Sequence, residues 1–255
     1  MKKMAKILAF ALCAIMVLSL FAACGTQKKA EEKAEALVVG ITDYKPMNYL
    51  DENGKWTGFD TEFAEAFGKI IGREVEFVEI DWDNKWLELE SGNIDCVWNG
   101  MTITDEAKLN ADVSDPYVTN NQVLVVKASD AAAIKTLEDF EGNVAAEAAS
   151  AGESAASDAG LTVDEYPLQT DALLAVKSGK AAGCVIDGTM ATAMIGEGTD
   201  YADLAVAFAL TDEQYGVAFK KGSDLLVKFN DALKTLTEDG TLYALAEKYN
   251  LTLAR

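Results

Sequence analysis

Histidine is absent from this chain of 255 residues. Without an imidazole base, the Ser-His and Cys-His arrangements that activate a nucleophile are excluded. Basic residues are also scarce, because 22 Lys and Arg residues stand against 42 Asp and Glu residues. The resulting net charge of −20 at pH 7 excludes nucleic acid as a partner, since its phosphates would be repelled. A solvated acidic surface that favours solubility explains most of this charge.

Cysteine is rare, with four residues in the chain. Cys96 and Cys184 lie inside the apolar runs "IDCVW" and "AGCVI", which have the composition of buried strands. A free cysteine behaves as a small hydrophobic residue in a protein core, which favours two buried thiols. A disulfide between them is the alternative, because the sequence alone does not decide pairing.

The amino-terminal segment has the pattern of an export signal. The apolar run Ile7 to Phe21 follows three lysines within the first six residues and is followed by Ala22 and Ala23. This run is shorter than the roughly 20 apolar residues of a membrane-spanning helix. We therefore expect residues 1–23 to be a signal peptide that takes no part in the fold.

The sequence "LFAAC", which ends at Cys24, resembles the lipobox of bacterial lipoproteins, although Phe21 stands where Leu or Val is more usual. The resemblance implies a lipid on Cys24 that holds the mature protein on the outer face of the cell membrane. Secretion with an incidental Cys24 is the alternative. Residues 24–36 are charged and poor in apolar residues, so we expect a flexible linker there. Removing three lysines from 22 leaves 19 basic against 42 acidic residues, and this charge of −23 opposes direct adhesion to anionic lipid.

From Leu37 onward, strand-like and helix-like segments alternate, which predicts an α/β fold. The first series has strands at "ALVVGIT", "VEFVEI" and "IDCVWNG" and a helix at "FDTEFAEAFGKIIG" that ends at Gly72. A second series has strands at "NVAAEAAS", "LTVDEYP" and "GCVIDG" and helices at "GESAASDAG" and "TDALLAVKSG". The two similar series favour two lobes.

Two further helices close the chain, and Asp239-Gly240 separates them. The apolar stripe of the first closing helix consists of Leu225, Leu226, Phe229, Leu233 and Leu236. The corresponding stripe of the helix that ends at Gly72 consists of Phe59, Phe63, Ala66, Phe67 and Ile70. Both stripes have helical spacing and predict core faces rather than binding sites.

Six segments follow one another along the chain: "VGITDYKPMNYLDENGKWTGFDTEFAEAFGK", "GNIDCVWNGMTITDEAK", "SDPY", "AASAGES", "VIDGTMA" and "YGVAFKKGSDL". This ordered set resembles the bacterial extracellular solute-binding proteins of family 3, which serve polar amino acid ABC importers. The resemblance extends from Leu37 to Leu251 and implies the type II periplasmic-binding-protein fold. It also implies a small-molecule ligand, ABC permease subunits as partners, a monomeric protein and no cofactor.

The resemblance further implies a ligand cleft between two lobes that close about a hinge. Lobe 1 would comprise residues 37–122 and 217–255, and lobe 2 would comprise residues 127–212. The hinge crossovers would be residues 123–126 and 213–216, next to or within "QVLVV" and "YGVAF".

Five residues of lobe 1 match ligand-binding positions of the family: Tyr44, Trp82, Asn99, Gly100 and Thr102. The two aromatic residues would enclose the ligand, because a π-face can bury an aliphatic stem or attract a cation. The other three would offer backbone and hydroxyl hydrogen bonds. The alternatives are a core position for Tyr44, a half-exposed surface position for Trp82, and a plain turn capped by Thr104 for the rest.

In lobe 2 the matching positions are Glu147, Ser150, Gly152 and Asp187. Ser150 and Glu153 have capping-box spacing at a helix start, whose free N–H groups would bind an anion. Asp187 matches the acid that receives the ligand's α-amino group, and an unpaired acid at the end of a buried strand would be costly. Its alternative role is the N-cap of the following helix. Glu147 is a second acid that would face the cleft, where an apolar residue is commoner.

The chain departs from the family's pattern at the arginine that clamps the ligand's α-carboxylate, because Ala107 stands there. Lys108 is adjacent and is a candidate substitute, although an ammonium is a point charge rather than a bidentate fork. Ala149 and Ala151 replace a Gly and a Thr of the helix-start motif, so one hydroxyl is missing. With two acids, two aromatic residues and no assigned cation, the cleft favours an amine-bearing ligand, most simply an amino acid.

Three other functions have some support in the sequence. An enzyme of the cyclohexadienyl dehydratase type could use Glu147 and Asp187 as acid and base, but neither lies in a catalytic motif, so we expect no catalysis. A calcium loop would place Asp51 and Glu62 at ligand positions, but Trp56 replaces the required glycine, so we expect no metal. A ligand sensor that takes no part in transport would have the same sequence features.

Overall fold

The computed structural model describes residues 35–254. The predicted signal peptide, the predicted lipid-bearing Cys24 and residues 24–34 of the predicted linker lie outside the described residues. Within residues 35–254, no helix combines the length and the apolar character needed to cross a membrane.

Strands and helices alternate along the described residues, which confirms the predicted α/β fold. The strands are β1 (Leu37–Ile41), β2 (Tyr49–Leu50), β3 (Trp56–Thr57), β4 (Val75–Glu79), β5 (Cys96–Thr102), β6 (Asp112–Val113), β7 (Val118–Lys127), β8 (Asn143–Glu147), β9 (Thr162–Tyr166), β10 (Gly183–Asp187) and β11 (Leu204–Phe219). The helices are α2 (Phe59–Ile71), α3 (Lys85–Ser91), α4 (Asp105–Asn110), α5 (Ala128–Ala131), α6 (Ala151–Asp158), α7 (Gln169–Ser178), α8 (Gly188–Met194), α9 (Leu225–Glu238) and α10 (Thr241–Tyr249). Two short 3-10 helices, η1 (Trp82–Asn84) and η2 (Leu137–Asp139), complete the described elements.

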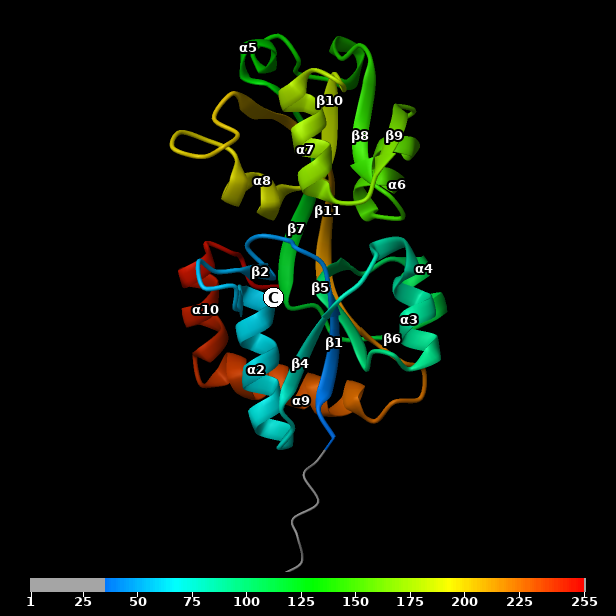
Figure 1. Cartoon of the computed structure of the whole chain (residues 1–255), viewed down its shortest axis with the longest axis vertical. Helices are drawn as coiled ribbons and strands as arrows, with labels where there is room; N and C mark the ends of the chain where they lie inside the picture. The colour runs from blue at the N-terminus through cyan, green and yellow to red at the C-terminus, as the bar shows by residue number, and fades with distance from the viewer. Residues whose placement is uncertain (1–34, 255) are drawn as a thin grey trace, which may run out of the picture. The chain divides into compact units, whose positions relative to one another are not determined.

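Nine of the described strands form one mixed sheet, in the order β4-β1-β5-β11-β7-β10-β8-β9, with β6 paired to β11. β4, β1 and β5 are parallel, as are β10, β8 and β9. We call β1 to β6, α2 to α4, α9 and α10 the first half of the fold, and β8 to β10 with α5 to α8 the second half. β7 and β11 belong to both halves and run from one to the other (Figure 1).

The partners of β7 and β11 change along their length. Residues 122–126 of β7 pair with β10 in the second half, whereas residues 215–219 of β11 pair with β5 in the first half. The predicted crossover 213–216 therefore includes the change of partner on β11. The predicted crossover 123–126 pairs throughout with β10, so the corresponding change on β7 comes before Gln122.

The apolar face of α2 packs into the core of the first half. Of the predicted stripe, Phe59, Phe63 and Phe67 are fully buried, Ala66 is partly buried and Ile70 is exposed. Phe63 and Phe67 contact the rings of Trp98 on β5 and Phe229 on α9. The helix ends at Gly72, whose φ of 70° is a left-handed conformation that glycine adopts at little cost. The predicted helix and its stop are confirmed.

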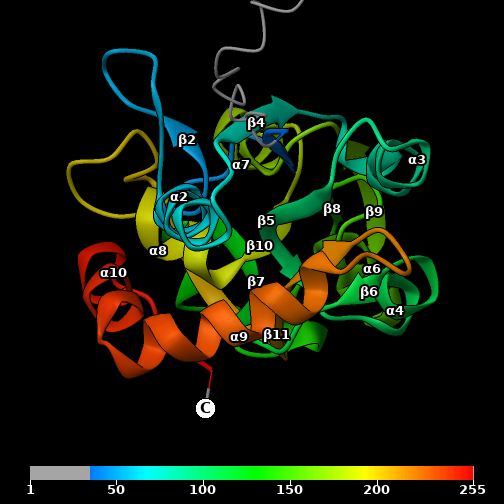
Figure 2. The ribbon, with the colours of Figure 1, turned by 90° about the horizontal axis from the view of Figure 1, so that it is seen from below.

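α9 and α10 both contact α2 in the first half, and α9 runs across its lower end, the side that faces the viewer in Figure 2. Of the predicted stripe on α9, Leu225, Phe229 and Leu236 are buried, and Leu226 and Leu233 are partly buried against the same core. The predicted core face is therefore confirmed. Gly240, with a φ of 86°, separates the two helices as expected.

The two cysteines of the described residues are free and buried, Cys96 on β5 and Cys184 on β10. The prediction of buried thiols is confirmed, and the alternative of a disulfide is wrong. Burial raises the pKa of both thiols, so the reactive thiolate form is disfavoured at either position.

Candidate functional site

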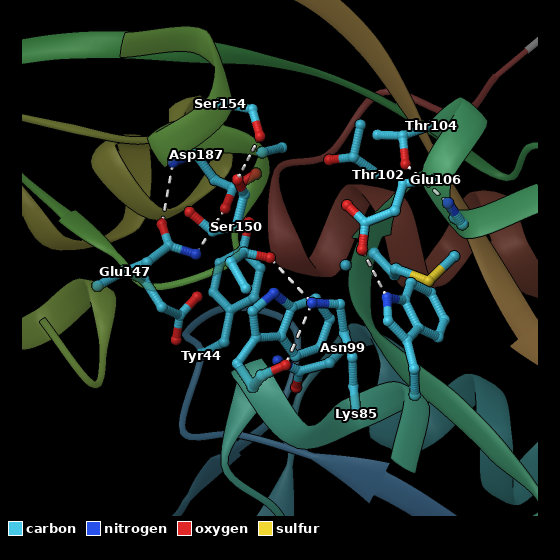
Figure 3. A pocket seen from close by; sticks show the side chains of 18 residues that line it. Tyr44, Lys85, Asn99, Thr102, Thr104, Glu106, Glu147, Ser150, Ser154 and Asp187 are labelled. Carbon is cyan, nitrogen blue, oxygen red and sulfur yellow. Dashed lines mark hydrogen bonds between the residues drawn. The ribbon is translucent and has the colours of Figure 1, made fainter. Parts of the chain in front are cut away.

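A cavity of about 50 Å³ lies between the two halves of the fold (Figure 3). All of the predicted ligand-binding residues line it except Gly152. The cavity wall also contains four residues with large polar or aromatic side chains that the sequence did not single out: Lys85, Trp86, Glu106 and Gln169. Side chains from both halves thus meet at one small polar space.

Tyr44 and Trp82 form an aromatic part of the cavity wall. Tyr44 is 2% exposed, and its hydroxyl lies 2.6 Å from Thr189 Oγ1 and 2.5 Å from the hydroxyl of Tyr215. Tyr44 also belongs to the hydrophobic core, so it combines the two roles considered for it. Trp82 is 8% exposed, and the alternative of a half-exposed surface position is therefore wrong.

The side chains of Asn99 and Thr102 are already hydrogen-bonded within the protein. Asn99 Oδ1 accepts from the Thr42 N–H at 3.1 Å and from Asn48 Nδ2 at 2.8 Å. Asn99 Nδ2 donates to Thr42 Oγ1 at 2.6 Å. Thr102 Oγ1 donates to Glu213 Oε1 at 2.9 Å but can still accept a bond. Asn99 therefore shapes the wall, whereas Thr102 keeps one free acceptor at the cavity.

Gly100 is needed for its shape rather than for a free N–H group. Its N–H donates to Asp60 Oδ2 at 2.7 Å, so this N–H is already used within the protein. The expectation that it would donate to a ligand is therefore corrected. Its φ is 56°, and a Cβ atom here would lie 2.6 Å from Cε1 of Tyr44. Only glycine allows the Tyr44 ring to come this close. Burial raises the pKa of Asp60 to about 7, although the Gly100 N–H opposes the rise.

The start of α4 places Ala107 at the cavity and Lys108 outside it. Thr104 Oγ1 accepts from the Ala107 N–H at 3.0 Å, which confirms Thr104 as the helix cap. Lys108 lines a separate groove with residues such as Asn250 and Thr252. Successive side chains on a helix point in directions about 100° apart, so neighbours do not share a face. The structure therefore does not support Lys108 as a substitute for the family's arginine.

The start of α6 follows the predicted capping arrangement with one change. Ser150 Oγ accepts from the Glu153 N–H at 3.1 Å, but Glu153 Oε2 accepts at 2.6 Å from the N–H of Ala149 rather than from that of Ser150. Ala149 has a φ of 54°, which explains why glycine suits this position. Among the described residues, no acceptor bonds the N–H of Ala151 or Gly152. Ala151 lines the cavity, whereas Gly152 packs closely against β10.

Asp187, at the end of β10, is 6% exposed and accepts four hydrogen bonds. Oδ1 accepts from Asn120 Nδ2 at 2.6 Å, Gln122 Nε2 at 2.9 Å and the Tyr215 hydroxyl at 2.6 Å, and Oδ2 accepts from Gln169 Nε2 at 2.6 Å. Asp187 occupies the N-cap position of α8, as the alternative had it, but its side chain makes no capping hydrogen bond. Oδ1 thus accepts three bonds and Oδ2 only one, so Oδ2 is the oxygen that can accept a further bond.

Burial gives both acids of the cavity raised pKa values. Desolvation, followed by the nearby Glu213 carboxylate, raises the pKa of Asp187 to about 7, and hydrogen bonds such as that from Tyr215 oppose the rise. Glu147 is 4% exposed, and desolvation with the nearby Asp187 raises its pKa to about 8. The Lys85 ammonium opposes this second rise. The two acids would be stabilised in their charged forms by a cation bound between them.

Lys85, the first residue of α3, is a buried cation of the cavity that the sequence analysis did not select. It is 4% exposed, and its Nζ donates to the carbonyl oxygens of Trp82 at 3.2 Å and Ala149 at 2.9 Å. Nζ also lies 4.8 Å from the ring centroid of Trp82 and 5.2 Å from that of Trp86. Burial lowers its pKa, while acids led by Glu106 oppose the change. Nothing in "WDNKWLELE" distinguishes this lysine from one on a solvated helix face.

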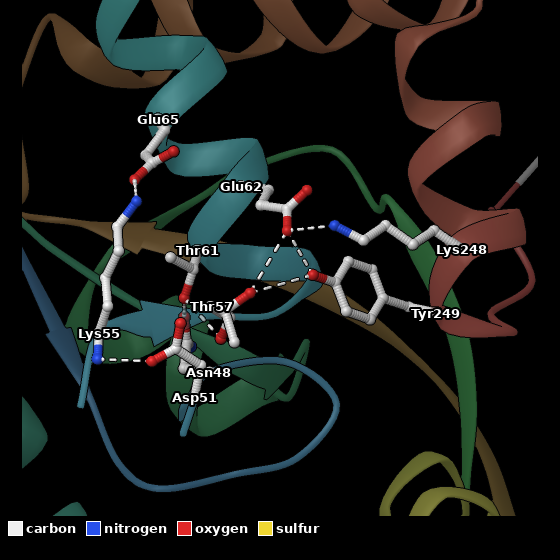
Figure 4. Close-up of polar contacts among 9 residues, drawn as sticks. All are labelled: Asn48, Asp51, Lys55, Thr57, Thr61, Glu62, Glu65, Lys248 and Tyr249. Carbon is white, nitrogen blue, oxygen red and sulfur yellow. Dashed lines mark hydrogen bonds and ion pairs between the residues drawn. The ribbon is translucent and has the colours of Figure 1, made fainter. Parts of the chain in front are cut away.

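The carboxylates of the rejected calcium loop are used in separate contacts (Figure 4). Asp51 Oδ1 accepts from the Lys55 N–H at 2.9 Å. Glu62 accepts from Lys248 Nζ at 2.6 Å and from the Tyr249 hydroxyl, which ties α2 to α10. Within residues 35–254, no group of three or more acidic or cysteine side chains is placed to hold a metal ion.

Comparison with known proteins agrees with this geometry. Residues 37–252 match the bacterial extracellular solute-binding proteins, family 3. The chain is 32% identical over 248 residues to the L-cystine-binding protein TcyJ of Escherichia coli (strain K12). The aligned region covers 95% of this chain and 92% of that protein. An ancestral arginine-binding protein bound to arginine has a TM-score of 0.77 and 37% identity, covering 84% of this chain and 97% of that chain. An ancestral amino acid-binding protein that is a precursor of cyclohexadienyl dehydratase has the same TM-score and identity, covering 84% and 95%. With this match over nearly all of the described residues and a shared type II periplasmic-binding-protein fold, the chain belongs to the bacterial extracellular solute-binding proteins, family 3.

Proposed function

We propose that this protein captures an amino acid outside the cytoplasm and delivers it to the permease of an ABC importer. The observation that carries the proposal is the cavity in which the buried acids Glu147 and Asp187 meet Tyr44 and Trp82. Carboxylates suit an ammonium group, and aromatic faces suit an aliphatic stem. Relatives named for L-cystine and arginine support an amino acid as the ligand.

The ligand's α-ammonium would bind between Glu147 and Asp187. Asp187 would accept from it at Oδ2, which has one protein donor, whereas Oδ1 already accepts three bonds. Within residues 35–254, Gln169 is the one side-chain hydrogen-bond partner that acts on the pKa of Glu147, which lines the same cavity, so Glu147 would accept the larger share of the ammonium hydrogen bonds. The Thr102 hydroxyl could accept a further bond, and the Ser150 hydroxyl could donate one.

An amino acid would enter only after the two halves separate. The cavity of about 50 Å³ is smaller than the cavity of about 150 Å³ that admits benzene in an engineered protein. We infer that the two halves move as two lobes, about a crossover at residues 213–216 on β11 and one before Gln122 on β7 rather than at the predicted 123–126. Within the described residues, the chain passes between the halves only along β7 and β11, which supports a hinge at these strands.

The protein would act as a monomer held at the membrane by a lipid on Cys24. The export signal and the "LFAAC" segment support this part of the proposal. An anchored binding protein stays near its permease, so the lipid would keep the captured amino acid close to the point of transport.

Calorimetric titration of the purified full-length protein with the twenty standard L-amino acids and L-cystine tests the ligand class. At least one of them should bind, and Glu147→Gln should weaken its binding more than about tenfold, the scale for loss of a charged hydrogen bond. Glu141→Gln, at an exposed position, is the matched control. Small-angle scattering should show a smaller radius of gyration when the binding amino acid is added. Failure of every amino acid to bind would contradict the proposal.

A dehydratase is the second candidate, because a structurally similar protein is a precursor of cyclohexadienyl dehydratase and the cavity holds two acids with raised pKa values. Mass spectrometry of the amino acid recovered after incubation would reveal the loss of one water molecule if the protein were such an enzyme. Sensing without transport is the alternative to delivery, and adjacent permease and ATPase genes would favour delivery.

A further inference from the structure

Lys85 is the only cationic side chain that lines the cavity within the described residues. Its stem starts in the first half of the fold, and its ammonium reaches the Ala149 carbonyl oxygen of the second half at 2.9 Å. The carbonyl oxygen of Trp82, at 3.2 Å, is its other acceptor. An ammonium has three N–H groups, so one of them has no acceptor among the described residues. A buried ammonium with an unused donor is costly, which favours a ligand that accepts from it.

The acids around Lys85 do not form ion pairs with it. No carboxylate lies within ion-pair distance of Lys85 in residues 35–254. The acids whose charges act on Lys85 are Glu106, Glu147, Asp83 and Glu153. Glu106 accepts at 2.8 Å from Trp86 Nε1, and Glu153 accepts from the Ala149 N–H. Glu147 lines the same cavity but lies beyond ion-pair distance, so Lys85 can still donate to a further group there.

Lys85 stands beside a second set of free donors at the start of α6. Its ammonium bonds to Ala149, and the N–H groups of Ala151 and Gly152 follow directly along the chain without acceptors in the described residues. α6 has eight residues, and its N-terminus adds a partial positive charge to that of the lysine. Lys85 and the start of α6 therefore offer donors to the cavity, whereas Glu147 and Asp187 offer acceptors.

We propose that Lys85 binds the α-carboxylate of the ligand and determines the preference of this cavity for amino acids over simple amines. The inference rests on the proposed function and adds the residue that recognises the negative end of the ligand. Ala107 offers no cation and Glu106 beside it is an acid, so the carboxylate would depend on Lys85 and on the N–H of Ala151.

The test compares each amino acid that binds with its decarboxylated amine, for example L-arginine with agmatine and L-cystine with cystamine. The protein as it exists should bind the amino acid about 10 to 100 times more tightly than the amine, the range for one charged hydrogen bond. Lys85→Met keeps the length and apolar stem of the side chain but removes the charge. In this variant the ratio should fall to within about threefold, since the charge-dependent part is lost.

The ratio also separates carboxylate recognition from a purely structural role. If Lys85 only linked the two halves through Ala149, its loss would weaken the binding of the amino acid and of the amine equally. The ratio of the two affinities would then stay unchanged. Lys85→Arg should keep most of the ratio, because it keeps a cation at the same position. The double variant Lys85→Met, Ala107→Arg should restore the ratio, because it places a cation on another part of the cavity wall. Lys108→Met, which changes a residue outside the cavity, should leave the ratio unchanged.

Each outcome has a distinct meaning. A ratio that is unchanged in Lys85→Met overturns this inference while the proposed function stands. Failure of all twenty-one amino acids to bind the unaltered protein overturns the proposed function and this inference with it. Thermal unfolding of each variant shows whether it is folded, and if Lys85→Met does not fold, the comparison of Lys85→Arg with Lys85→Gln decides the question in the same way.

Discussion

The hydroxyl of Tyr215 donates a hydrogen bond of 2.6 Å to Oδ1 of Asp187, which joins β11 to the end of β10 at the cavity. The same oxygen accepts from Asn120 and Gln122 of β7. Asp187 therefore connects the two long strands that pass between the halves to the proposed ammonium site. A change at this carboxylate should affect both the stability of the fold and the binding of a ligand.

Asp187→Asn should weaken binding of the amino acid by roughly 2 kcal/mol or more, the scale for loss of one partner from a buried charged pair. The new amide would also turn an N–H₂ group toward existing donors, so the free energy of unfolding should fall by about 1–3 kcal/mol. Titration calorimetry and urea denaturation measure the two effects. Asp158→Asn, at an exposed position near the end of α6, is the control and should change neither. Undiminished binding in Asp187→Asn would refute the assignment of the ammonium site.

Binding of the amino acid should become tighter as the pH rises from 6 to 8. The pKa of Glu147 is raised to about 8 in the empty protein, so this acid is mostly protonated at pH 6. A ligand ammonium favours the ionised carboxylate, and binding below pH 8 should therefore release a proton. Calorimetry in two buffers of different ionisation enthalpy measures the protons released.

Glu147→Gln should remove the part of this proton release that occurs near pH 8 and leave the smaller part below about pH 7 that Asp187, whose pKa is raised to about 7, contributes. Glu141→Gln should change neither the proton release nor the dependence of affinity on pH, because the Glu141 side chain is exposed. Proton uptake on binding, or the same release in Glu147→Gln, would show that another group receives the ammonium.

Gly100→Ala should destabilise the protein by about 3–5 kcal/mol, because it combines backbone strain with a clash at a buried site. The added Cβ would lie 2.6 Å from the Tyr44 ring, at a φ of 56°. Gly160→Ala is a matched control, since Gly160 has a φ of 78° but no atom within 4 Å of the added Cβ. This control should cost only about 1–2 kcal/mol from the strained φ. Equal losses in the two variants, measured by urea denaturation, would argue against close packing of Tyr44 on Gly100.

Cys24→Ser should release the protein from the membrane fraction, because the side chain that we expect to carry the lipid is lost. Cell fractionation and immunoblotting measure the distribution. A serine substitution at Cys13, within the predicted signal peptide, should leave the protein anchored. Retention of the Cys24→Ser protein in the membrane would mean that another segment holds it there.

Local sequence patterns predicted most of the elements of this fold. The stripe on α2 and its stop at Gly72, the stripe on α9, and the buried strands of Cys96 and Cys184 all follow from the spacing of apolar residues and the position of glycine. These features depend on neighbours within one or two helical turns, which is the range that a sequence pattern records. The first part of β11, from Leu204, was missed because it pairs only with β7, and its mixture of exposed and buried residues lacks the continuous apolar run of the other strands.

The chemistry of the cavity was decided by contacts between distant parts of the chain. The resemblance to a family selected Tyr44, Trp82, Glu147 and Asp187, and the folded chain brings all four to one cavity. Sequence could not show that the N–H of Gly100 is donated to Asp60, 40 residues away. It also could not distinguish Lys85 from Lys108. Lys85 reaches Ala149, 64 residues away, whereas Lys108 faces another groove, because the packing of α3 and α4 on the sheet determines which lysine points into the cavity.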